Sequence, residues 1–376
     1  MQKATLIQRR FRLFLFQKHT KDRVEEVNAS NLALWREMQE EFKARWPEIK
    51  RKKRIEIHIN SLSCAEMKRI SMEKFLQREN AQIARLFAVR DPNVDVVYVS
   101  PFSLTSDVTG YYMKILEIGD IDNGLSRVNI VVPENTHRFP HHFSLAQMLV
   151  YSPKTIKRIK SLVKGRQAYI VPGVSPSADD IKVSVMLQVP IMCGEPSKQS
   201  LYSTKSGAKK VFALADVPTP ISAVDIYDEQ EFLLQLAKLI ANNLYVNTWL
   251  FKIDDEFNGR GHAYLTVDNI KQLADIRRKQ VEINEELVDR IINVLRKQLA
   301  KKVKLALGKL YSDWSEYLAS FCRVGGVIEA APTCLSVQMG SPSISFLIEP
   351  DGEVQLVGSL DRFAAREYLN AGCMFP

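Results

Sequence analysis

Hydrophobic residues follow two periods along this chain, and the change from one period to the other predicts its elements. Four short β-rich segments alternate apolar with polar residues or collect apolar ones, at 55–60, 94–99, 127–132 and 167–171. Between the first two, residues 65–89 carry apolar side chains at helical spacing. Short strands separated by helix-length segments predict a parallel α/β sheet with helices on its faces.

Ligands of such sheets usually bind beyond the carboxyl ends of the strands, which points to the loops at 100–103, 133–135 and 172–175. The first strand is not followed by G-x-G-x-x-G, so a dinucleotide site is not predicted. The pair His141-His142 has no acid or thiolate at a ligand spacing, and we interpret it as part of a surface loop rather than a metal site.

The first fifty residues predict a basic helical arm. Residues 4–46 contain neither Gly nor Pro and mix apolar with charged side chains, and Pro47 is the expected stop. The segment Ile7-Gln8-Arg9-Arg10-Phe11-Arg12 resembles the start of an IQ motif. That resemblance implies a complex with calmodulin or a related light chain. Ile7 would sit in a groove of one lobe, Gln8 would bond to its backbone, and Arg12 would meet its acidic rim.

The IQ resemblance is partial. Leu13 stands where the motif has glycine, and Gln17 stands where it has a second basic residue, with Lys18 one place later. Two other interpretations of the arm stay open: its apolar face packs on the chain's own core, or it lies on anionic lipid.

After residue 195 the pattern predicts a different order of elements. A short strand is expected at 190–194, and helices at 197–215, 228–243 and 283–310. Between the last two, one strand ends in Lys252, a turn contains Gly259-Arg260-Gly261, and a second strand follows. Such a lysine beside a glycine loop suits phosphate, because glycine lets backbone N–H groups approach anionic oxygens. An ordinary hairpin with a solvated Lys252 is the alternative.

Four segments in order are similar to those of ATP-grasp ligases, most closely of a peptide-ligase-like branch: STKSGAKKVFALADVPTP, FKIDDEFNGRGHA, GGVIEAAP and SPSISFLIEPDGEVQLVG. The resemblance implies an α/β domain followed by lobes that hold ATP. It assigns Lys205 and Lys252 to the nucleotide phosphates, Gly259, Arg260 and Gly261 to a loop over them, and Glu329 to the hinge that receives adenine. The alternative roles are structural: an exposed helical Lys205, a solvated Glu329, and an Arg260 paired with Asp254 or Asp255.

The resemblance weakens at the magnesium site. The family holds its metal with a late acid and a Glu-x-Asn pair, because a hard cation needs oxygen ligands. After residues 346–352 this sequence has no Glu-x-Asn, and Glu349 and Asp351 have the spacing of hairpin residues. We therefore expect either a piece of a longer protein or a relative that has lost its chemistry, with magnesium bound only by ligands beyond residue 376.

Charge and cysteine content bound the remaining possibilities. Residues 1–54 hold 15 Lys/Arg and 7 Asp/Glu, a balance of +8 out of the chain's +9. The run at 50–54 suits nucleic acid or nuclear import, although a solvated linker is the simpler interpretation. The five cysteines form no CxxC pair, which indicates a reducing compartment, and no apolar run reaches the roughly 20 residues of a membrane helix.

These observations together predict three regions: a basic arm (1–49), an α/β pre-ATP-grasp-like domain (50–195) and an incomplete α+β ATP-grasp-like domain (196–376). The function they favour is that of a cytoplasmic, calmodulin-binding regulatory protein that binds ATP without being a competent enzyme as this chain. A carboxylate–amine ligase completed beyond residue 376 is the first alternative, and a basic nucleic-acid-binding protein is the second.

Overall fold

The computed structural model describes residues 2–121, 124–257, 259–279, 283–331, 341–366 and 368–375. The chain divides into two units. The first unit comprises Met1–Ser197 with Ile348–Val354, and the second comprises Lys198–Leu347 with Gln355–Pro376. Each unit has its own sheet and its own hydrophobic core, so each is described by itself.

The first unit is built on a parallel sheet, as the sequence predicts, and the strand order of this sheet is β3-β2-β1-β4. Ile55, Ile57 and Ile59 of the central strand enter a core formed with the helices on one face, while η1 and α4 cover β2 on the other. Its elements are α1 (Gln2–Ile49), β1 (Arg54–Leu62), α2 (Glu66–Ser71), α3 (Phe75–Asn80), η1 (Ile83–Arg90), β2 (Val94–Val99), α4 (Ser106–Ile118), η2 (Gly124–Arg127), β3 (Val128–Val131), η3 (Thr136–Arg138), α5 (Leu145–Val150), α6 (Pro153–Val163), β4 (Gln167–Val174) and α7 (Ala178–Leu187).

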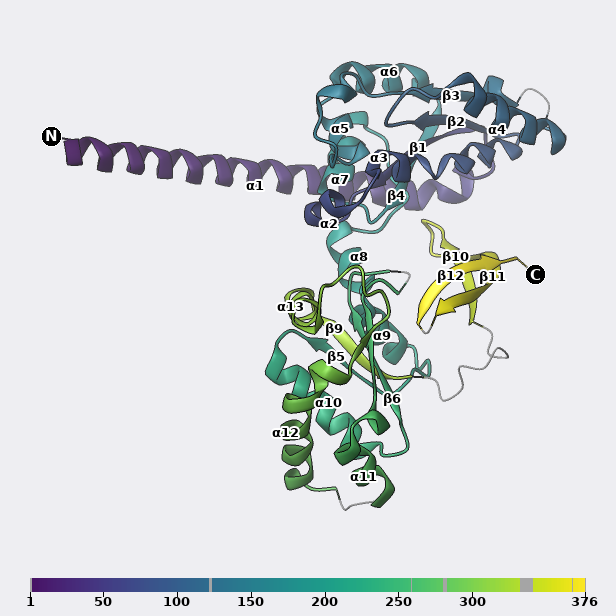
Figure 1. The fold of residues 1–376 in the computed structure, drawn as a ribbon. Coiled ribbons are helices and arrows are strands. Elements are labelled where there is room, and N and C mark those ends of the chain that lie inside the picture. The colour runs from purple at the N-terminus through teal and green to yellow at the C-terminus, as the bar shows by residue number, and fades with distance from the viewer. Residues whose placement is uncertain are drawn as a thin grey trace. The chain divides into compact units, whose positions relative to one another are not determined.

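The N-terminal arm is the single helix α1, whose first half extends away from the rest of its unit (Figure 1). The expected stop at Pro47 is wrong, because the helix continues to Ile49. Trp46 and Ile49, on either side of the proline, are 3% and 6% exposed and pack with Phe42 against Tyr169 of β4. This packing outweighs the backbone hydrogen bond that proline cannot make.

The helix predicted over 65–89 is broken into α2, α3 and η1, which is a second correction. Lys74, between α2 and α3, has a φ of 53° and turns the chain. The break places polar side chains against distant backbone: Arg69 donates to the His142 carbonyl at 2.9 Å, and Glu79 accepts the Leu62 and Leu145 amides at 2.9 and 3.0 Å. Buried polar groups require such partners, and a continuous amphipathic pattern does not reveal them.

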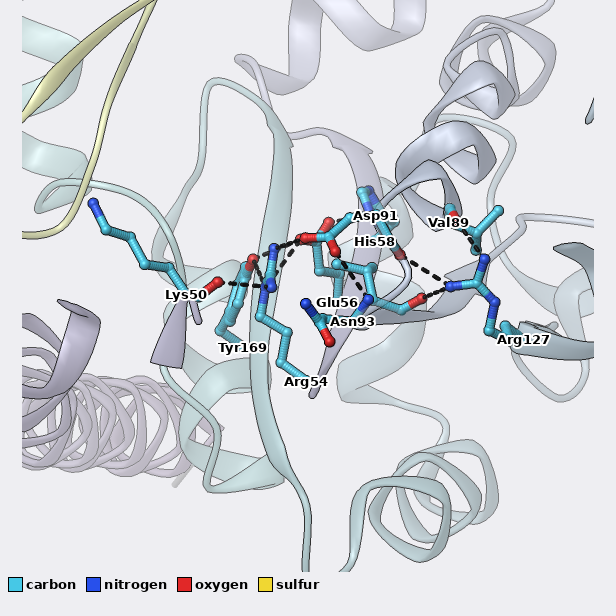
Figure 2. Close-up of polar contacts among 10 residues, drawn as sticks. Lys50, Arg54, Glu56, His58, Val89, Asp91, Asn93, Arg127 and Tyr169 are labelled. Carbon is cyan, nitrogen blue, oxygen red and sulfur yellow. Dashed lines mark hydrogen bonds and ion pairs between the residues drawn. The ribbon is translucent and has the colours of Figure 1, made fainter. Parts of the chain in front are cut away.

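A buried polar row on β1 fastens the end of α1 to the sheet. Figure 2 shows Arg54 between the Asp91 carboxylate, 2.8 Å from its Nη2, and the Tyr169 hydroxyl, 3.2 Å from its Nε. Arg54 also donates to the Lys50 carbonyl at 3.1 Å, just after α1 ends. Tyr169 in turn donates to Glu56 at 2.6 Å. Burial would raise the pKa of Glu56, but hydrogen bonds from His58 and Tyr169 hold it below its usual value.

The turn at Ile348–Val354 belongs to the first unit through contacts with α1. Glu349 is 7% exposed and accepts the indole N–H of Trp46 and the ammonium of Lys50, each at 2.8 Å. Lys50 also bonds to Glu353 at 2.8 Å. A buried carboxylate held by two donors fixes this turn more firmly than exposed ion pairs would.

The second unit contains a five-stranded sheet, β5-β9-β6-β7-β8, and a three-stranded sheet, β10-β11-β12. The strand pairs of the five-stranded sheet are antiparallel, as is the pair β11–β12. Its elements are α8 (Pro196–Tyr202, beginning in the first unit), α9 (Lys205–Leu214), β5 (Ser222–Ile226), α10 (Glu229–Asn242), β6 (Thr248–Ile253), β7 (His262–Thr266), η4 (Val267–Asn269), α11 (Lys271–Lys279), α12 (Glu285–Lys302), β8 (Lys304–Leu305), α13 (Trp314–Val324), β9 (Gly326–Ala330), β10 (Ser341–Ile348), β11 (Val354–Arg366) and β12 (Leu369–Met374). The predicted fold class, a parallel α/β region followed by an α+β region behind a helical arm, is confirmed.

Three predicted elements of the second half need correction. The helix expected at 197–215 is divided, because Thr204 caps α9 by accepting the Gly207 amide at 2.9 Å. The helix expected at 283–310 ends at Lys302, and Leu305 then pairs with Ala263 at the edge of the sheet. The strand expected at 190–194 is reduced to one parallel bridge between Ile170 and Ile191.

The buried carboxyl of Glu79 predicts a pH-dependent stability. Glu79 is 0% exposed, and burial raises its pKa to about 7 despite its two backbone donors. Because the pKa is higher in the folded state than in the unfolded chain, its contribution is fully present below about pH 4.3 and is lost as pH rises through 7. Glu79→Gln should therefore gain up to about 3 kcal/mol relative to wild type between pH 4 and pH 8.5.

Thermal unfolding of both proteins at these two pH values measures that gain. The exposed Glu73, six residues earlier in the chain and outside α3, provides the control, and Glu73→Gln should have the stability of wild type at both pH values. A stability difference between Glu79→Gln and wild type that does not change with pH would contradict the assignment.

Candidate functional site

The two faces of the five-stranded sheet are different in kind. Trp249, Phe251 and Ile253 of β6 enter the core with α10, α12 and α13, as do Ala263 and Leu265 of β7. The alternate residues therefore point to the opposite face, since side chains of a strand alternate. The side chains of this face, which we call the open face, include Leu250, Lys252, His262, Tyr264, Val327 and Glu329.

Glu329 is the centre of the open face. Its Oε2 lies 3.0 Å from the Lys209 ammonium of α9, and its Oε1 forms an ion pair with Lys252 on the neighbouring strand. The Glu329 side chain is 9% exposed, against 13% for Lys209 and 23% for Lys252. Burial would raise the pKa of Glu329, but the two lysines hold it below its usual value.

Lys205 of α9 has a different position from Lys252. Its ammonium donates to the carbonyls of Ile253, at 2.6 Å, and of Glu256, so it holds the turn that follows β6. In the same turn, Asp254 accepts the backbone amide and the hydroxyl of Ser206 at 2.9 and 3.0 Å. The two contacts dock the start of α9 on the end of β6, which brings Lys209 to Glu329.

The loop at 259–261 is tightly packed. Gly259 has a φ of 81°, and a Cβ there would lie 2.4 Å from the Tyr368 carbonyl. A Cβ on Gly261 would lie 2.6 Å from Glu256, so both positions require glycine. Arg260 pairs with Glu256 at 3.2 Å and lies over the Phe257 ring, rather than pairing with Asp254 or Asp255.

His262 is a residue that sequence reasoning missed, and it reports the electrostatics of the open face. It lies beside Lys252 in the β6–β7 register, and its Nδ1 lies 2.9 Å from the Tyr368 carbonyl. Burial lowers its pKa to about 4, with Lys252 and Lys205 adding to the effect against the opposing hydrogen bond. His262 is therefore neutral at pH 7. A histidine after a glycine loop was the available signal.

A small apolar cluster adjoins these charges. Leu250, Tyr264 and Ala331 are buried together, and the Tyr368 ring lies 4.9 Å from that of Tyr264. Leu250 is paired in register with Glu329 on β9. The open face thus places an apolar patch next to a cluster of cations, which is the combination that a nucleotide base and its phosphates require.

The predicted ligand loops of the first unit are engaged by their own fold. Ser100 donates to the Phe102 carbonyl at 2.6 Å, and Glu134 accepts the Thr155 hydroxyl at 2.6 Å at the start of α6. Gly173 lies so close to Ser61 that a Cβ would meet its carbonyl at 2.0 Å. His142 lies 3.1 Å from Glu66. These contacts explain the conformation of the loops, so no ligand is needed to explain it.

The acids of the described residues do not fit a magnesium site on the open face. Glu329 is occupied by two lysines and Asp254 by Ser206. One group of three acids, Glu349, Asp351 and Glu353, brings oxygens within 4.8 Å of one another, but Lys50 bonds to two of its members. As the hairpin spacing indicated, Glu349 and Asp351 belong to a turn, in which the Gly352 amide donates to the Glu349 carbonyl at 2.9 Å.

The IQ-like segment lies on the extended half of α1. Every described side chain from Gln8 to Val27 is exposed, including Arg12, and Phe11 is 59% exposed. The side chain of Ile7 lies outside the described residues. The prediction that this apolar face packs on the chain's own core is wrong, since its aromatic residues are exposed. No helix in the described part of the chain is long and apolar enough to cross a membrane.

Comparisons with known proteins agree with this architecture. Residues 196–376 match a family model described as IQCH-like, ATP-grasp. The chain is 34% identical over 385 residues to the IQ motif-containing protein H of Danio rerio, an alignment that covers 95% of this chain. It covers 36% of that relative, so the chain spans about a third of the relative's length.

The following two solved structures resemble this chain in fold but have lower sequence identity to it than the Danio rerio protein has. The biotin carboxylase domain of the Hydrogenobacter thermophilus 2-oxoglutarate carboxylase has a TM-score of 0.40 at 15% identity, over 85% of this chain and 52% of that one. D-alanyl-alanine synthetase A of Vibrio cholerae has a TM-score of 0.37 at 11% identity, over 84% and 68%.

Because Glu329 is buried, we predict that replacing its carboxylate by a neutral group lowers the free energy of unfolding substantially. Glu329→Gln leaves two half-buried ammonium groups without their carboxylate, and we expect a loss of about 3 kcal/mol in the free energy of unfolding. The matched control is Asp225→Asn. This change removes the more exposed ion pair between Asp225 and Lys210, which neighbours Lys209 on α9, and should lower the free energy of unfolding by less than about 1 kcal/mol.

Urea unfolding at pH 7 and pH 3 measures both costs. Because the pKa of Glu329 is lowered in the folded state, its stabilisation is present above about pH 4.5 and is lost as pH falls through the folded value. The cost of Glu329→Gln should therefore shrink in acid. Equal costs for the two substitutions at pH 7 would contradict this description.

Proposed function

Because residues 196–376 form an IQCH-like ATP-grasp domain, we propose that this chain binds ATP on the open face and a calmodulin-type partner on α1, and acts as a regulatory protein. The observation that carries the nucleotide proposal is the convergence of Lys209 and Lys252 on one buried carboxylate, Glu329. Two cations facing one acid leave positive charge that an anionic ligand can neutralise.

The charge balance supports a polyphosphate in particular. Burial is the main cause of the low pKa of His262, and Lys252 and Lys205 lower it further, which agrees with the positive charge of these lysines at this place. A polyphosphate carries several negative charges and can compete with the single Glu329 carboxylate for the exposed side of Lys252. The ion pair meanwhile keeps Lys209 and Lys252 in place before a ligand arrives, which lowers the cost of ordering them.

Each part of the open face would have a distinct role in holding ATP. Lys209 and Lys252 would bind phosphate oxygens, and the loop at 259–261 would supply backbone N–H groups, as its glycines allow. The patch of Leu250, Tyr264 and Ala331 would take the adenine ring beside the hinge at Glu329, in place of the Tyr368 ring that packs on it. Lys205 is a positioning residue in this proposal, because its ammonium is spent on backbone carbonyls. Bound ATP would supply a transferable phosphoryl group.

The alternative is a carboxylate–amine ligase whose metal ligands lie elsewhere. The acids of the described residues favour the regulatory proposal over it, since those of the open face are already paired. Release of ADP on addition of an acid and an amine would favour the ligase.

Calorimetry with ATP tests the nucleotide proposal. We expect binding to wild-type protein, and a dissociation constant raised about tenfold or more in Lys252→Ala or Lys209→Ala, because each change removes a charge-assisted contact of about 1.5–3 kcal/mol. Lys210→Ala is the matched control, because this lysine neighbours Lys209 on α9 but pairs with Asp225 at 2.6 Å. The affinity of this variant for ATP should stay within about twofold of the wild-type value.

Titrations with and without magnesium, followed by assay for ADP, complete that experiment. The proposal would be overturned if wild-type protein gave no heat of binding with ATP, or if all three variants lost affinity for ATP equally. Circular dichroism of each variant establishes that its fold is retained.

The second half of the proposal is supported by the exposure of α1. Phe11, Phe14 and Leu15 are 59%, 57% and 47% exposed beside Arg9 and Arg12. A basic helix with an uncovered apolar side is the target that the lobes of calmodulin recognise in a groove.

Binding of full-length protein to labelled calmodulin, in calcium and in chelator, tests this part. Ile7→Asp with Arg12→Glu should weaken binding at least about tenfold, since it removes a groove anchor and reverses a rim charge. Val24→Asp with Arg23→Glu repeats the same chemistry further along the exposed helix and should change affinity by less than about threefold. Failure of the wild-type protein to bind in either condition would refute the proposal.

A further inference from the structure

The helix α6 carries a concentration of positive charge that the net charge of the chain conceals. Residues 151–166 contain six basic side chains and no acid, although the chain after residue 54 is nearly neutral overall. Ile156, Ile159 and Val163 of α6 face the core. The basic residues therefore occupy the remaining faces of the helix: Lys154, Lys157, Arg158, Lys160, Lys164 and, just after it, Arg166.

Most of these charges have no acidic partner. In the part of the chain that the structure describes, Lys154, Lys157, Arg158, Lys160 and Lys164 are exposed and form no ion pair, whereas Arg166 pairs with Asp95. Two of them lie in the last turn of α6 or just beyond it, where the helix dipole favours cations. A dipole of about half a charge does not require so many cations, so the surplus is available to a ligand.

A groove with an apolar floor runs beside this basic face. It has a volume of about 520 Å³ and lies between α1, the end of α6, the start of β4 and the segment after α7. Its apolar lining consists of partly exposed residues, Met38, Ala168 and Pro190, and of buried ones beneath them, Phe42, Ile49, Val163, Leu187 and Val189. Its basic lining consists of Arg45, Lys160, Lys164 and Arg166, against one acid, Glu41, which pairs with Arg45 at 3.2 Å.

We propose that this groove is a docking site for an acidic amphipathic segment of a partner protein, with apolar side chains on the floor and carboxylates at Lys160 and Lys164. The volume lies within the usual range of about 300–1,000 Å³ for binding sites. Charge complementarity selects the partner, because a rim of unpaired ammonium groups favours carboxylates and repels cations. The site is separate from the open face and from the IQ-like segment, so it stands independently of the proposed function.

The lining favours a protein segment over nucleic acid. Single strands are held largely by bases that stack on accessible aromatic rings. The aromatic residue of the groove, Phe42, is 3% exposed and packs at 5.3 Å from Trp46 and 5.6 Å from Tyr169. The more accessible apolar residues of the lining are Met38, Ala168 and Pro190. None of them is aromatic, and they suit the leucine or isoleucine side chains of a peptide.

Fluorescence anisotropy with the full chain tests the proposal. The probe is a labelled peptide of about 16 residues that repeats Glu-Glu-Leu-Leu, and the comparison ligands are a Glu-Glu-Ser-Ser peptide and an oligothymidylate of equal charge. We expect the leucine peptide to bind at least about tenfold more tightly than either comparison ligand, with affinity falling as salt rises.

Two double substitutions distinguish binding in the groove from non-specific attraction to the positive charge of α6. Lys160→Glu with Lys164→Glu should weaken binding at least about tenfold, whereas Lys154→Glu with Lys157→Glu, on the same helix but outside the groove, should change it less than about threefold. Ser161→Trp, at an exposed lining position, fills the groove without changing charge and should also abolish binding.

The variant Ile7→Asp with Arg12→Glu should bind the peptide as wild type does, which separates this site from the calmodulin proposal. Equal losses in the two lysine pairs, tighter binding of the oligothymidylate, or undiminished binding by Ser161→Trp would overturn the proposal.

Discussion

The ion pairs of Glu329 with Lys209 and Lys252 are the interaction on which the open face of the second unit depends. Isolated burial of these lysines would be costly, and burial of the acid alone would be costly as well. Together they let a strand lysine and a helix lysine converge on the open face with little exposure of their side chains. The arrangement requires α9 to dock on the end of β6, which Lys205 and Asp254 accomplish through backbone contacts. One buried carboxylate therefore organises cations from two elements that are distant in sequence.

The first unit uses the same principle for a structural purpose. Arg54 joins Asp91, Tyr169 and the carbonyl of Lys50, so a buried polar network fixes the end of α1 to the parallel sheet. Trp46 and Lys50 then hold the turn at Glu349. The arm is thus firmly anchored at one end and exposed at the other. An exposed helix on a rigid base presents its side chains to a partner without folding on binding, which limits the entropic cost.

Much of this fold could be predicted from the sequence because strand alternation and apolar periodicity survive in it. The four parallel strands follow from their β-rich runs, and the β6–β7 hairpin follows from Lys252 and its glycine loop. Predictions failed where a tertiary contact decides the local structure. The packing of Trp46 carries α1 past Pro47, and the partners of Arg69 and Glu79 break the helix after residue 65. The Lys209–Glu329 pair depends on how α9 docks, which no local pattern encodes. His262 was missed because its importance is its position beside Lys252.

The most direct test of the account is the titration of His262 by nuclear magnetic resonance, with and without ATP. The account predicts a pKa of about 4 in the free protein, lowered by burial and by the nearby lysines. ATP on the open face would neutralise those lysines and raise the pKa of His262 measurably. A pKa of His262 that does not change at saturating ATP would contradict the claim that this face is a polyphosphate-binding surface.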